Sequence, residues 1–236
     1  MGWGTLATTE VIDRLVTSVW GEDKKGKTHF SMTFPPPIYF INFNYGYQEV
    51  YNRHFVGKEI YFEHFLVTHD PGSHREMLAR AVTKYLEALK LGEQNGGSVV
   101  VDLASELWTL IQSVKLEDVK ARKAKAKGIE AEDVQVHQFD YGQANLFMAG
   151  LMKQALATPH VNVCLLSDSS ARYNEKGNDT GQVKFHGWNP MRGIVPVTLR
   201  AMEPGKILID RNRFDTTLEG TTVKDADYER VRAIIL

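Results

Sequence analysis

One short segment constrains the fold of this chain more than any other: Gly21-Glu-Asp-Lys-Lys-Gly26-Lys27-Thr28. It follows Leu15-Val-Thr-Ser-Val-Trp20, a β-branched run that predicts a strand. A helix that starts at Lys27 must end before Pro35-Pro-Pro37, because proline lacks a backbone N–H and its ring clashes with the preceding turn. The segment is therefore a loop, bounded by glycines, that leads from a strand into a short helix.

The spacing Gly-x-x-x-x-Gly-Lys-Thr is that of a phosphate-binding Walker A loop. Two glycines let successive backbone N–H groups face a phosphate, Lys27 adds a positive charge, and Thr28 offers a hydroxyl to Mg²⁺. The alternative is a lysine-rich surface turn, but the flanking strand and helix favour a site for ATP or a related nucleotide. We expect this site to comprise Gly21, Glu22, Asp23, Lys24, Lys25, Gly26, Lys27, Thr28 and His29.

A carboxylate for the same site follows a second apolar run, Ser98-Val-Val-Val-Asp102. An acid at the end of a neighbouring strand holds Mg²⁺ in proteins of this kind. Asp102 also stands where it would cap the next helix, and the two roles are compatible. Thr28 and Asp102 are therefore the expected metal ligands.

Strand-type and helix-type segments alternate along the rest of the chain. Further strands are expected at Ile38–Phe43, Glu59–Val67, Val161–Leu166, Val195–Ala201 and Lys206–Asp210. Helices are expected at Ser73–Leu91, Asp140–Ala157 and Asp225–Ile235, and another should follow Asp102 and run on to Lys127. Ser73 and Glu76 fit a capping box, and Gly92 would end that helix. The alternation predicts an α/β fold of three layers, with helices on both faces of a mostly parallel sheet, in one domain over residues 1–236.

The composition excludes several classes of protein. A net charge of −1 gives no global positive field for nucleic acid, and a single cysteine excludes an intrachain disulfide. Cys164 lies in an apolar run and is expected to be a small buried hydrophobe. The histidines, His64, His69 and His74 among them, lack a helical metal spacing. Without a signal-like segment or an apolar stretch near the ~20 residues of a membrane span, we expect a cytoplasmic protein with no membrane contact.

Several segments together resemble a known family. They are the loop 21–28, Pro-Pro-Ile-Tyr-Phe-Ile-Asn at 36–42, Val-Val-Asp-Leu-Ala-Ser-Glu-Leu-Trp at 100–108, Asp-Tyr-Gly at 140–142 and Ile-Asp-Arg-Asn-Arg-Phe at 209–214. In this order they are similar to the RecA-like P-loop ATPases of bacteriophages, the Sak-type single-strand annealing branch. The resemblance covers residues from about Leu15 to Ile235.

This resemblance implies a RecA-like core, Mg-ATP as cofactor, and a role in phage recombination on single-stranded DNA inside the host cytoplasm. It also implies work with a single-strand-binding protein and assembly of the chain into rings or filaments. Arg211 and Arg213 would then serve as trans-acting residues across a subunit interface, with surface ion pairing as the alternative. Ser167 or Asp168 holds the place of the polar residue that senses the γ-phosphate, although a structural role at the start of a loop is favoured.

The chain departs from the RecA pattern where hydrolases of that type carry a glutamate, shortly after the second core strand. Asn44 stands there, and an amide positions water without accepting its proton. Glu106, one helical turn past Asp102, is the substitute general base, with a solvated helix residue as the alternative; Glu49 is a weaker candidate. The catalytic set is then Lys27, Asn44 and Glu106.

Two segments are candidates for contact with DNA. Residues 167–182 contain almost no apolar residue and predict a long mobile loop, in which Arg172, Tyr173 and Lys176 combine cations with an aromatic ring. The helix ending at Lys127 carries a basic stretch with Lys120, Arg122 and Lys123. Acidic neighbours dilute that stretch, so a solvated helix face is the favoured interpretation.

Three functions fit these observations. The first is an ATP-hydrolysing, RecA-like protein that acts on single-stranded DNA in recombination or annealing. The second is a nucleotide-binding switch or assembly protein with little or no hydrolysis. The third, a small-molecule kinase, lacks support because no arginine-rich lid is evident in the sequence.

Overall fold

The computed structural model describes residues 13–67, 70–174 and 177–236. Its main sheet has eight strands in the order β10-β9-β8-β1-β5-β4-β2-β3. Strands β8 to β3 run parallel, and β9 and β10 extend the sheet antiparallel at one edge. The strands are β1 (Val16–Trp20), β2 (Ile38–Asn42), β3 (Ile60–His64), β4 (Ser98–Asp102), β5 (Asn162–Ser167), β8 (Val197–Glu203), β9 (Lys206–Asn212) and β10 (Thr222–Lys224).

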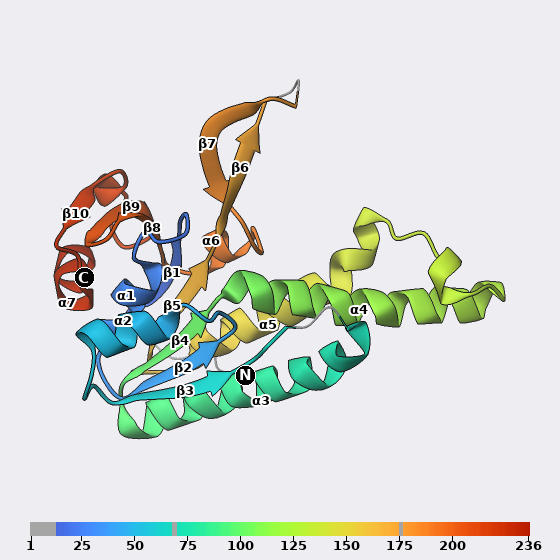
Figure 1. The fold of residues 1–236 in the computed structure, drawn as a ribbon, viewed down its shortest axis with the longest axis horizontal. Helices are drawn as coiled ribbons and strands as arrows, with labels where there is room; N and C mark the ends of the chain where they lie inside the picture. The colour runs from blue at the N-terminus through green and yellow to red at the C-terminus, as the bar shows by residue number, and fades with distance from the viewer. Residues whose placement is uncertain (1–12, 68–69, 175–176) are drawn as a thin grey trace, which may run out of the picture.

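Helices cover both faces of this sheet, which confirms the predicted three-layer α/β fold (Figure 1). One face carries α3 (Pro71–Asn95), α4 (Ala104–Lys127), α5 (Gly142–Ala157) and the short α6 (Met191–Ile194). The other carries α1 (Lys27–Met32), α2 (Tyr47–His54) and α7 (Tyr228–Ile235). Three 3₁₀ turns complete the elements: η1 (Ala131–Asp133), η2 (Gln138–Tyr141) and η3 (Thr216–Leu218).

The two layers of helices bury two separate hydrophobic clusters. Successive side chains of a strand point to opposite faces, so Val99 and Val101 of β4 join the cluster under α3, α4 and α5, whereas Val100 joins the other. Cys164 of β5 is fully buried in the second cluster, and burial raises the pKa of its thiol well above the usual value. A strand that is buried on both faces must be apolar throughout, which explains the run of valines.

Parallel pairing brings the carboxyl ends of four strands to one edge of the sheet. Trp20 lies beside Ser167 in the β1–β5 ladder, and Asn42 lies beside Asp102 in the β2–β4 ladder. Strand β5 separates β1 from β4. The loops that follow these strands therefore face one another, although the residues involved are far apart in the sequence.

The predicted mobile loop at 167–182 is wrong. The segment forms a hairpin of β6 (Ser169–Tyr173) and β7 (Asp179–Phe185), a second sheet that projects from the body (Figure 1). Its turn is closed by a hydrogen bond from the Asn174 N–H to the Asn178 carbonyl, 2.9 Å. Most of its side chains face water on both sides. Only Val183 and Phe185, at its base, pack against the core, and backbone pairing holds most of its length.

Helix α3 also differs from its expectation. It begins at Pro71, capped by the Asp70 carboxylate that accepts from the Gly72 N–H at 3.0 Å, so the capping box at Ser73 is wrong. It continues through Gly92, which packs against Val161, and ends at Asn95. Helix α2 was not predicted, although Tyr47, Val50 and Tyr51 pack against the core at helical spacing.

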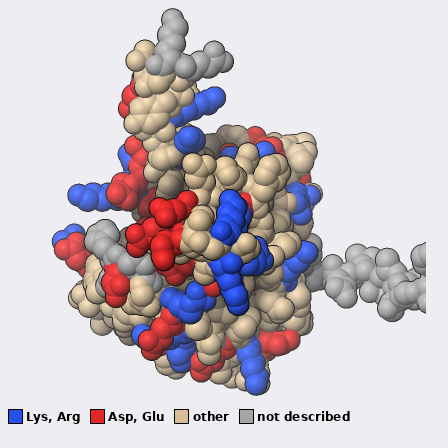
Figure 2. Space-filling view, turned by 90° about the vertical axis from the view of Figure 1, so that its right-hand side faces the viewer, with Lys and Arg blue, Asp and Glu red and all other residues tan. Residues whose placement is uncertain are grey.

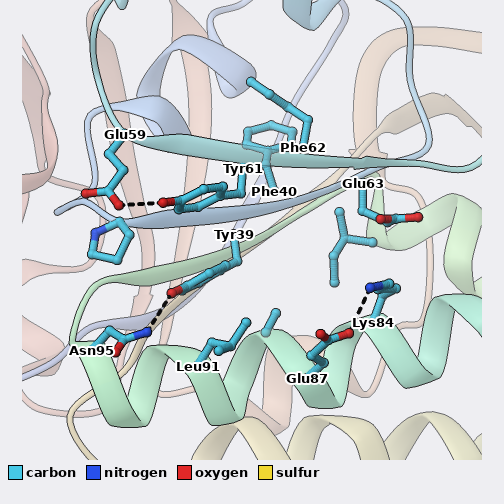
Figure 3. Close-up of a pocket in the computed structure, with 13 residues that line it drawn as sticks. Tyr39, Phe40, Glu59, Tyr61, Phe62, Glu63, Lys84, Glu87, Leu91 and Asn95 are labelled. Carbon is cyan, nitrogen blue, oxygen red and sulfur yellow. Dashed lines mark hydrogen bonds and ion pairs between the residues drawn. The ribbon is translucent and has the colours of Figure 1, made fainter.

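The outer edge of β3 has no strand partner among the described residues, and a groove of about 560 Å³ lies between this edge and α3 (Figure 3). Within it, the rings of Tyr39 and Tyr61 stack with centroids 5.6 Å apart. Pro37 and Asn95 line the groove where β2 begins and α3 ends, so it extends to the end of the sheet opposite the loop 21–28. In the part of the chain that the structure describes, no helix is long and apolar enough to span a membrane.

Close backbone packing before β4 generates a first prediction. Gly97 has φ of 96°, and an added Cβ would lie 2.2 Å from the Pro37 carbonyl oxygen, whereas Gly96, with φ of 76°, has no atom within 4 Å of that position. We expect Gly97→Ala to lower the free energy of unfolding by about 3 kcal/mol or more, because the strand must move, and Gly96→Ala to lower it by about 1 kcal/mol. Urea denaturation measures both variants, and equal losses would contradict the packing argument.

Candidate functional site

The loop 21–26 turns tightly between β1 and α1, under the β8–β9 connection. Gly26 is in the left-handed region with φ of 87°, and an added Cβ would lie 3.1 Å from the Pro204 Cα. At Gly21, the same atom would lie 2.6 Å from the Ala201 carbonyl oxygen. Because both contacts are with neighbouring backbone, only glycine fits, and the two glycines of the motif are explained by packing as well as by the path of the loop.

Lys27 is the best-connected side chain of the loop. Its buried ammonium donates to the carbonyl oxygens of Gly21 at 2.7 Å and Glu22 at 3.2 Å, and it contacts Asp168 Oδ1 at 3.0 Å. Asp23 Oδ1 lies 3.9 Å away on an exposed side chain. The sequence favoured a structural role for Asp168 at the start of a loop. In the structure, its carboxylate also forms an ion pair with Lys27. A nucleotide phosphate at this position competes with the Asp168 carboxylate for the same ammonium.

Thr28 and Asp102, the two expected metal ligands, are in direct contact. The Thr28 hydroxyl donates to Asp102 Oδ2 at 2.8 Å. Asp102 is buried, and this burial raises the pKa of its carboxyl to about 6, an increase that the Thr28 hydrogen bond and the Lys27 charge oppose. Its other oxygen, Oδ1, is buried without a hydrogen-bond partner among the described residues.

An unpartnered carboxylate oxygen next to a hydroxyl fits the needs of Mg²⁺. This ion prefers oxygen ligands and is commonly held by one or two protein side chains together with substrate phosphates. Among the residues described, no group of three or more His, Cys, Asp or Glu could hold a metal by itself. Thr28 and Asp102 would therefore share the ion with a bound nucleotide, and Mg²⁺ would neutralise charge on the β- and γ-phosphates.

The other residues of the expected nucleotide site differ in exposure. Glu22, Asp23 and Lys24 are exposed, and Lys25 is half-buried. His29 turns toward α2, where its ring lies 5.0 Å from His54 and 5.1 Å from Phe55 between centroids. Burial, and then the His54 charge, lower the pKa of His29. His29 therefore packs α1 against α2.

The two expected catalytic residues beyond Lys27 lie at the carboxyl ends of β2 and β4. Asn44 is exposed, and its Oδ1 accepts from the Gly46 N–H at 3.4 Å within the loop that follows β2. Glu106 lies in the first turn of α4, half-buried, and makes no hydrogen bond or ion pair with another described residue. Glu106 thus has a free carboxylate, whereas Asn44 has only an amide.

Polar contacts behind the loop hold the end of β1. The Trp20 indole donates to Asp210 Oδ2 at 3.0 Å, and Arg192 donates to the same oxygen at 2.7 Å. The Arg200 guanidinium lies 4.9 Å from the Trp20 ring centroid. Sequence reasoning missed this set, because its members lie on β1, α6, β8 and β9 and share no sequence pattern.

The candidate trans-acting arginines lie away from the loop. Arg211 pairs with Thr198 at the start of β8, and Arg213 donates its N–H to the Pro196 carbonyl at 2.9 Å. Thr198 lies beside Ser18 in the β1–β8 ladder, so Arg211 lies level with the middle of β1, on a strand two positions away from it. Neither side chain forms a hydrogen bond or ion pair with a described residue of the loop 21–28.

The candidate DNA-contacting residues fall on two separate projections. Arg172 and the 60% exposed Tyr173 lie on β6, whereas Lys176 lies outside the described residues. On α4, Lys123 forms an ion pair with Asp140 at 2.7 Å, while Lys120 and Arg122 have no such partner in the described chain. Figure 2 shows acidic side chains beside the basic ones on the face it views, without a continuous basic surface.

Two cavities connect the loop with the hairpin. The larger, about 690 Å³, is lined by acids from both sides: Glu22, Asp23, Asp168 and Asp179. The smaller, about 440 Å³, is lined by Arg172 and Arg200 as well as Glu22. The hairpin base is part of the phosphate site, since β6 begins one residue after Asp168 and the His186 N–H donates to the Asp168 carbonyl at 2.9 Å.

Comparison with known proteins agrees with this geometry. The model of one family, described as an AAA domain, matches residues 14–199. No curated protein matches the chain. An ATPase from the type III secretion system of pathogenic bacteria is similar in structure, with a TM-score of 0.52 and 10% identity over 93% of this chain and 62% of that one. The chain thus spans about three fifths of that ATPase, and at this identity the likeness shows the fold alone.

A second solved structure, of the RadB recombinase, has a TM-score of 0.40 and 13% identity, covering 88% of this chain and 84% of that chain. A score this low carries no argument about function.

Burial of Asp102 generates a second prediction. A pKa raised from 3.8 to about 6 means that the folded protein binds this proton more tightly than the unfolded chain. Relative to the unfolded chain, the protonated carboxyl stabilises the folded protein fully below pH 3.8. This contribution to the free energy of unfolding, about 3 kcal/mol, is lost as the pH rises through about 6. In metal-free buffer at pH 7.5, we expect Asp102→Asn to unfold at a higher temperature than the wild type, with the difference shrinking toward pH 4.

The control for this prediction is Asp23→Asn, which removes an exposed carboxylate of the loop 21–26. Its thermal unfolding should follow the wild type at every pH. If Asp102→Asn were less stable than the wild type at pH 7.5, the proposed cost of the buried charge would be wrong.

The Lys27–Asp168 contact generates a third prediction. We expect Asp168→Asn to bind ATP about fivefold more tightly, because a half-buried ion pair worth about 1 kcal/mol no longer competes with the phosphates. Asp179→Asn is the matched control, since it removes one charge from the same cavity without contacting Lys27. Titration with a fluorescent ATP analogue measures both, and an equal gain would assign the effect to general charge.

Proposed function

This chain belongs to the AAA domain family, and from that premise we propose that it is a RecA-like ATPase that binds Mg-ATP and acts on single-stranded DNA. The arrangement that carries the proposal is the convergence of Lys27, Thr28 and Asp102 at one edge of the sheet. A loop that turns back on itself, a buried ammonium and a hydroxyl–carboxylate pair are the parts that phosphoryl transfer from a nucleotide requires.

We assign hydrolysis to Glu106 as the group that orients or deprotonates water. It is the carboxylate nearest in sequence to Asp102, one turn into α4, and it has no competing partner in the described chain. Asn44 has no proton-accepting group of this kind, so it cannot act as the general base. Lys27 stabilises the charge that develops on the transferred phosphoryl group.

The hairpin supports single-stranded DNA as the partner. Arg172 on β6 and Arg200 on β8 line one polar cavity, and Tyr173 presents an exposed ring farther along the same strand. Cations for the phosphates and an aromatic surface for the bases are the combination used for single strands. The hairpin starts at Asp168, so the same segment contacts the nucleotide site and extends to the proposed DNA site.

We further propose that the chain works as a bacteriophage recombination or annealing protein of the Sak-type branch, in a homo-oligomeric ring or filament and with a single-strand-binding protein. The order of its sequence motifs supports this. Arg211 and Arg213 form no hydrogen bond or ion pair with described residues of their own phosphate loop, and in such an assembly they would act toward a neighbouring copy.

A second candidate function is a nucleotide-operated switch with little hydrolysis. The specific observation in its favour is the acidic surrounding of Lys27, where Asp168 and Asp23 lie 3.0 and 3.9 Å from the ammonium. Charges of this sign repel a polyphosphate and slow turnover. In this case, nucleotide binding would change the hairpin without requiring chemistry.

One experiment separates these functions. We expect wild-type protein with Mg-ATP to hydrolyse ATP faster when single-stranded DNA is added, and Lys27→Ala to lose nucleotide binding and turnover by at least tenfold, because it removes the buried charge. Lys24→Ala, which removes an exposed lysine of the same loop, should behave as the wild type. Phosphate release and ATP affinity are measured for all three proteins, with and without DNA.

The outcomes test the phosphate site and distinguish the two candidate functions. Nucleotide binding that survives in Lys27→Ala would overturn the phosphate site. Binding without turnover, unchanged by single-stranded DNA, would favour the switch over the DNA-dependent ATPase.

A further inference from the structure

A small cavity of about 250 Å³ lies at the same edge of the sheet as the phosphate loop, where β2 and β3 end. It is separate from the cavities under the hairpin and from the groove of Figure 3. Its volume is below the range of pockets that enclose a whole drug-sized ligand, so it fits one flat ring system. Its lining residues are Asn42, Phe43, Asn44, Tyr45, Tyr47, Gln48, His64, Phe65 and Leu66.

The floor of this cavity is held by a chain of side-chain hydrogen bonds. Asn42 Nδ2 lies 3.2 Å from His64 Nδ1, and His64 Nε2 lies 3.1 Å from the Tyr47 hydroxyl. An amide –NH₂ only donates, so His64 Nδ1 accepts and its proton is on Nε2. Tyr47 then accepts from His64 and keeps its own hydroxyl hydrogen free to donate.

The walls combine aromatic rings with unused amide groups. Phe43 and Phe65 stack with centroids 5.2 Å apart, and Tyr45 is 72% exposed beside them. The Gln48 side chain and the Asn44 Nδ2 group make no hydrogen bond with another described residue. Each amide carries donors, and Gln48 also carries a free acceptor, which is what the edge of a nucleobase requires.

We propose that this cavity binds one unpaired base of single-stranded DNA, stacked on Tyr45, with Asn44 and Gln48 at its edge. Stacking on an exposed aromatic ring is the common way in which proteins hold unpaired bases. Free amide groups and the Tyr47 hydroxyl add the polar contacts that a purely apolar groove would lack. This inference rests on the proposed function, because it names the part of the DNA that the protein contacts.

The position of the cavity argues for a DNA base over the base of the bound nucleotide. Asp102 on β4 marks the side of the loop where Thr28 and the γ-phosphate share a metal ion. In the strand order, β4 lies between β2, which leads to the cavity, and β1, which leads to the phosphate loop, so the cavity and the loop lie on opposite sides of Asp102. A base at Tyr45 would therefore belong to a second molecule. The loop that carries Tyr45 lies next to Asp102, because the Phe43 N–H donates to the Asp102 carbonyl.

The test compares two labelled oligonucleotides of equal length by fluorescence anisotropy: an ordinary single strand and one that is abasic throughout. We expect wild-type protein to bind the ordinary strand more tightly, and Tyr45→Ala to weaken that binding about tenfold while leaving the abasic strand unchanged. Tyr45→Phe keeps the ring and should bind like the wild type. Tyr61→Ala removes another exposed tyrosine, outside the cavity, and should also bind like the wild type.

Three outcomes would overturn the inference. If wild-type protein binds both strands equally and Tyr45→Ala changes neither, the subsite is wrong, although the proposed action on DNA stands. If Tyr45→Ala weakens ATP binding instead of DNA binding, the cavity takes the base of the nucleotide. If wild-type protein binds neither strand, the proposed DNA function itself fails, and the subsite with it.

Discussion

Parallel pairing of β1, β5, β4 and β2 is the constraint on which the rest of the structure depends. Parallel strands need a crossover connection for each pair, and those helices cover both faces of the sheet. The same pairing collects all carboxyl ends at one edge, so Trp20, Asn42, Asp102 and Ser167 lie within a few strands of one another. Every part of the proposed chemistry follows from loops at this edge.

Two buried charged groups lie at that edge beside the phosphate loop. Lys27 is buried with Asp168 as its ion-pair partner, and Asp102 is buried with one oxygen unpaired. Burying a charged group is costly unless a partner offsets it. In the proposed function, a nucleotide with its metal ion would satisfy both groups together, since phosphate would contact the ammonium and the ion would bind the free carboxylate oxygen. Binding would then relieve the cost that the folded protein carries at these groups.

Asp168 connects the phosphate loop to the β6–β7 hairpin. It follows β5, touches Lys27 through its side chain and, through its backbone, closes the base of the β6–β7 hairpin. A phosphate that displaces Asp168 from Lys27 acts on the first residue of the hairpin. The aromatic cavity at Tyr45 lies at the opposite side of Asp102, on the loop after β2. The two proposed DNA contacts therefore lie on either side of the metal site, and both are one connection away from it.

The sequence alone determined the phosphate loop, the Asp102 strand and the alternation that builds three layers, because each depends on local spacing or on burial along one strand. The sequence did not determine the cap and the end of α3. Asp70 caps this helix, and Gly92 lies inside it, where Val161 leaves little room for a Cβ atom. The hairpin was not predicted because most of its side chains are exposed on both faces, so the sequence carries no apolar alternation over most of its length. Only the tertiary structure decided that Asp168 meets Lys27, that Asp210 meets Trp20 and that Tyr45 borders a cavity. These are contacts between segments distant in sequence, and strand order, which no local pattern encodes, determines which of them meet.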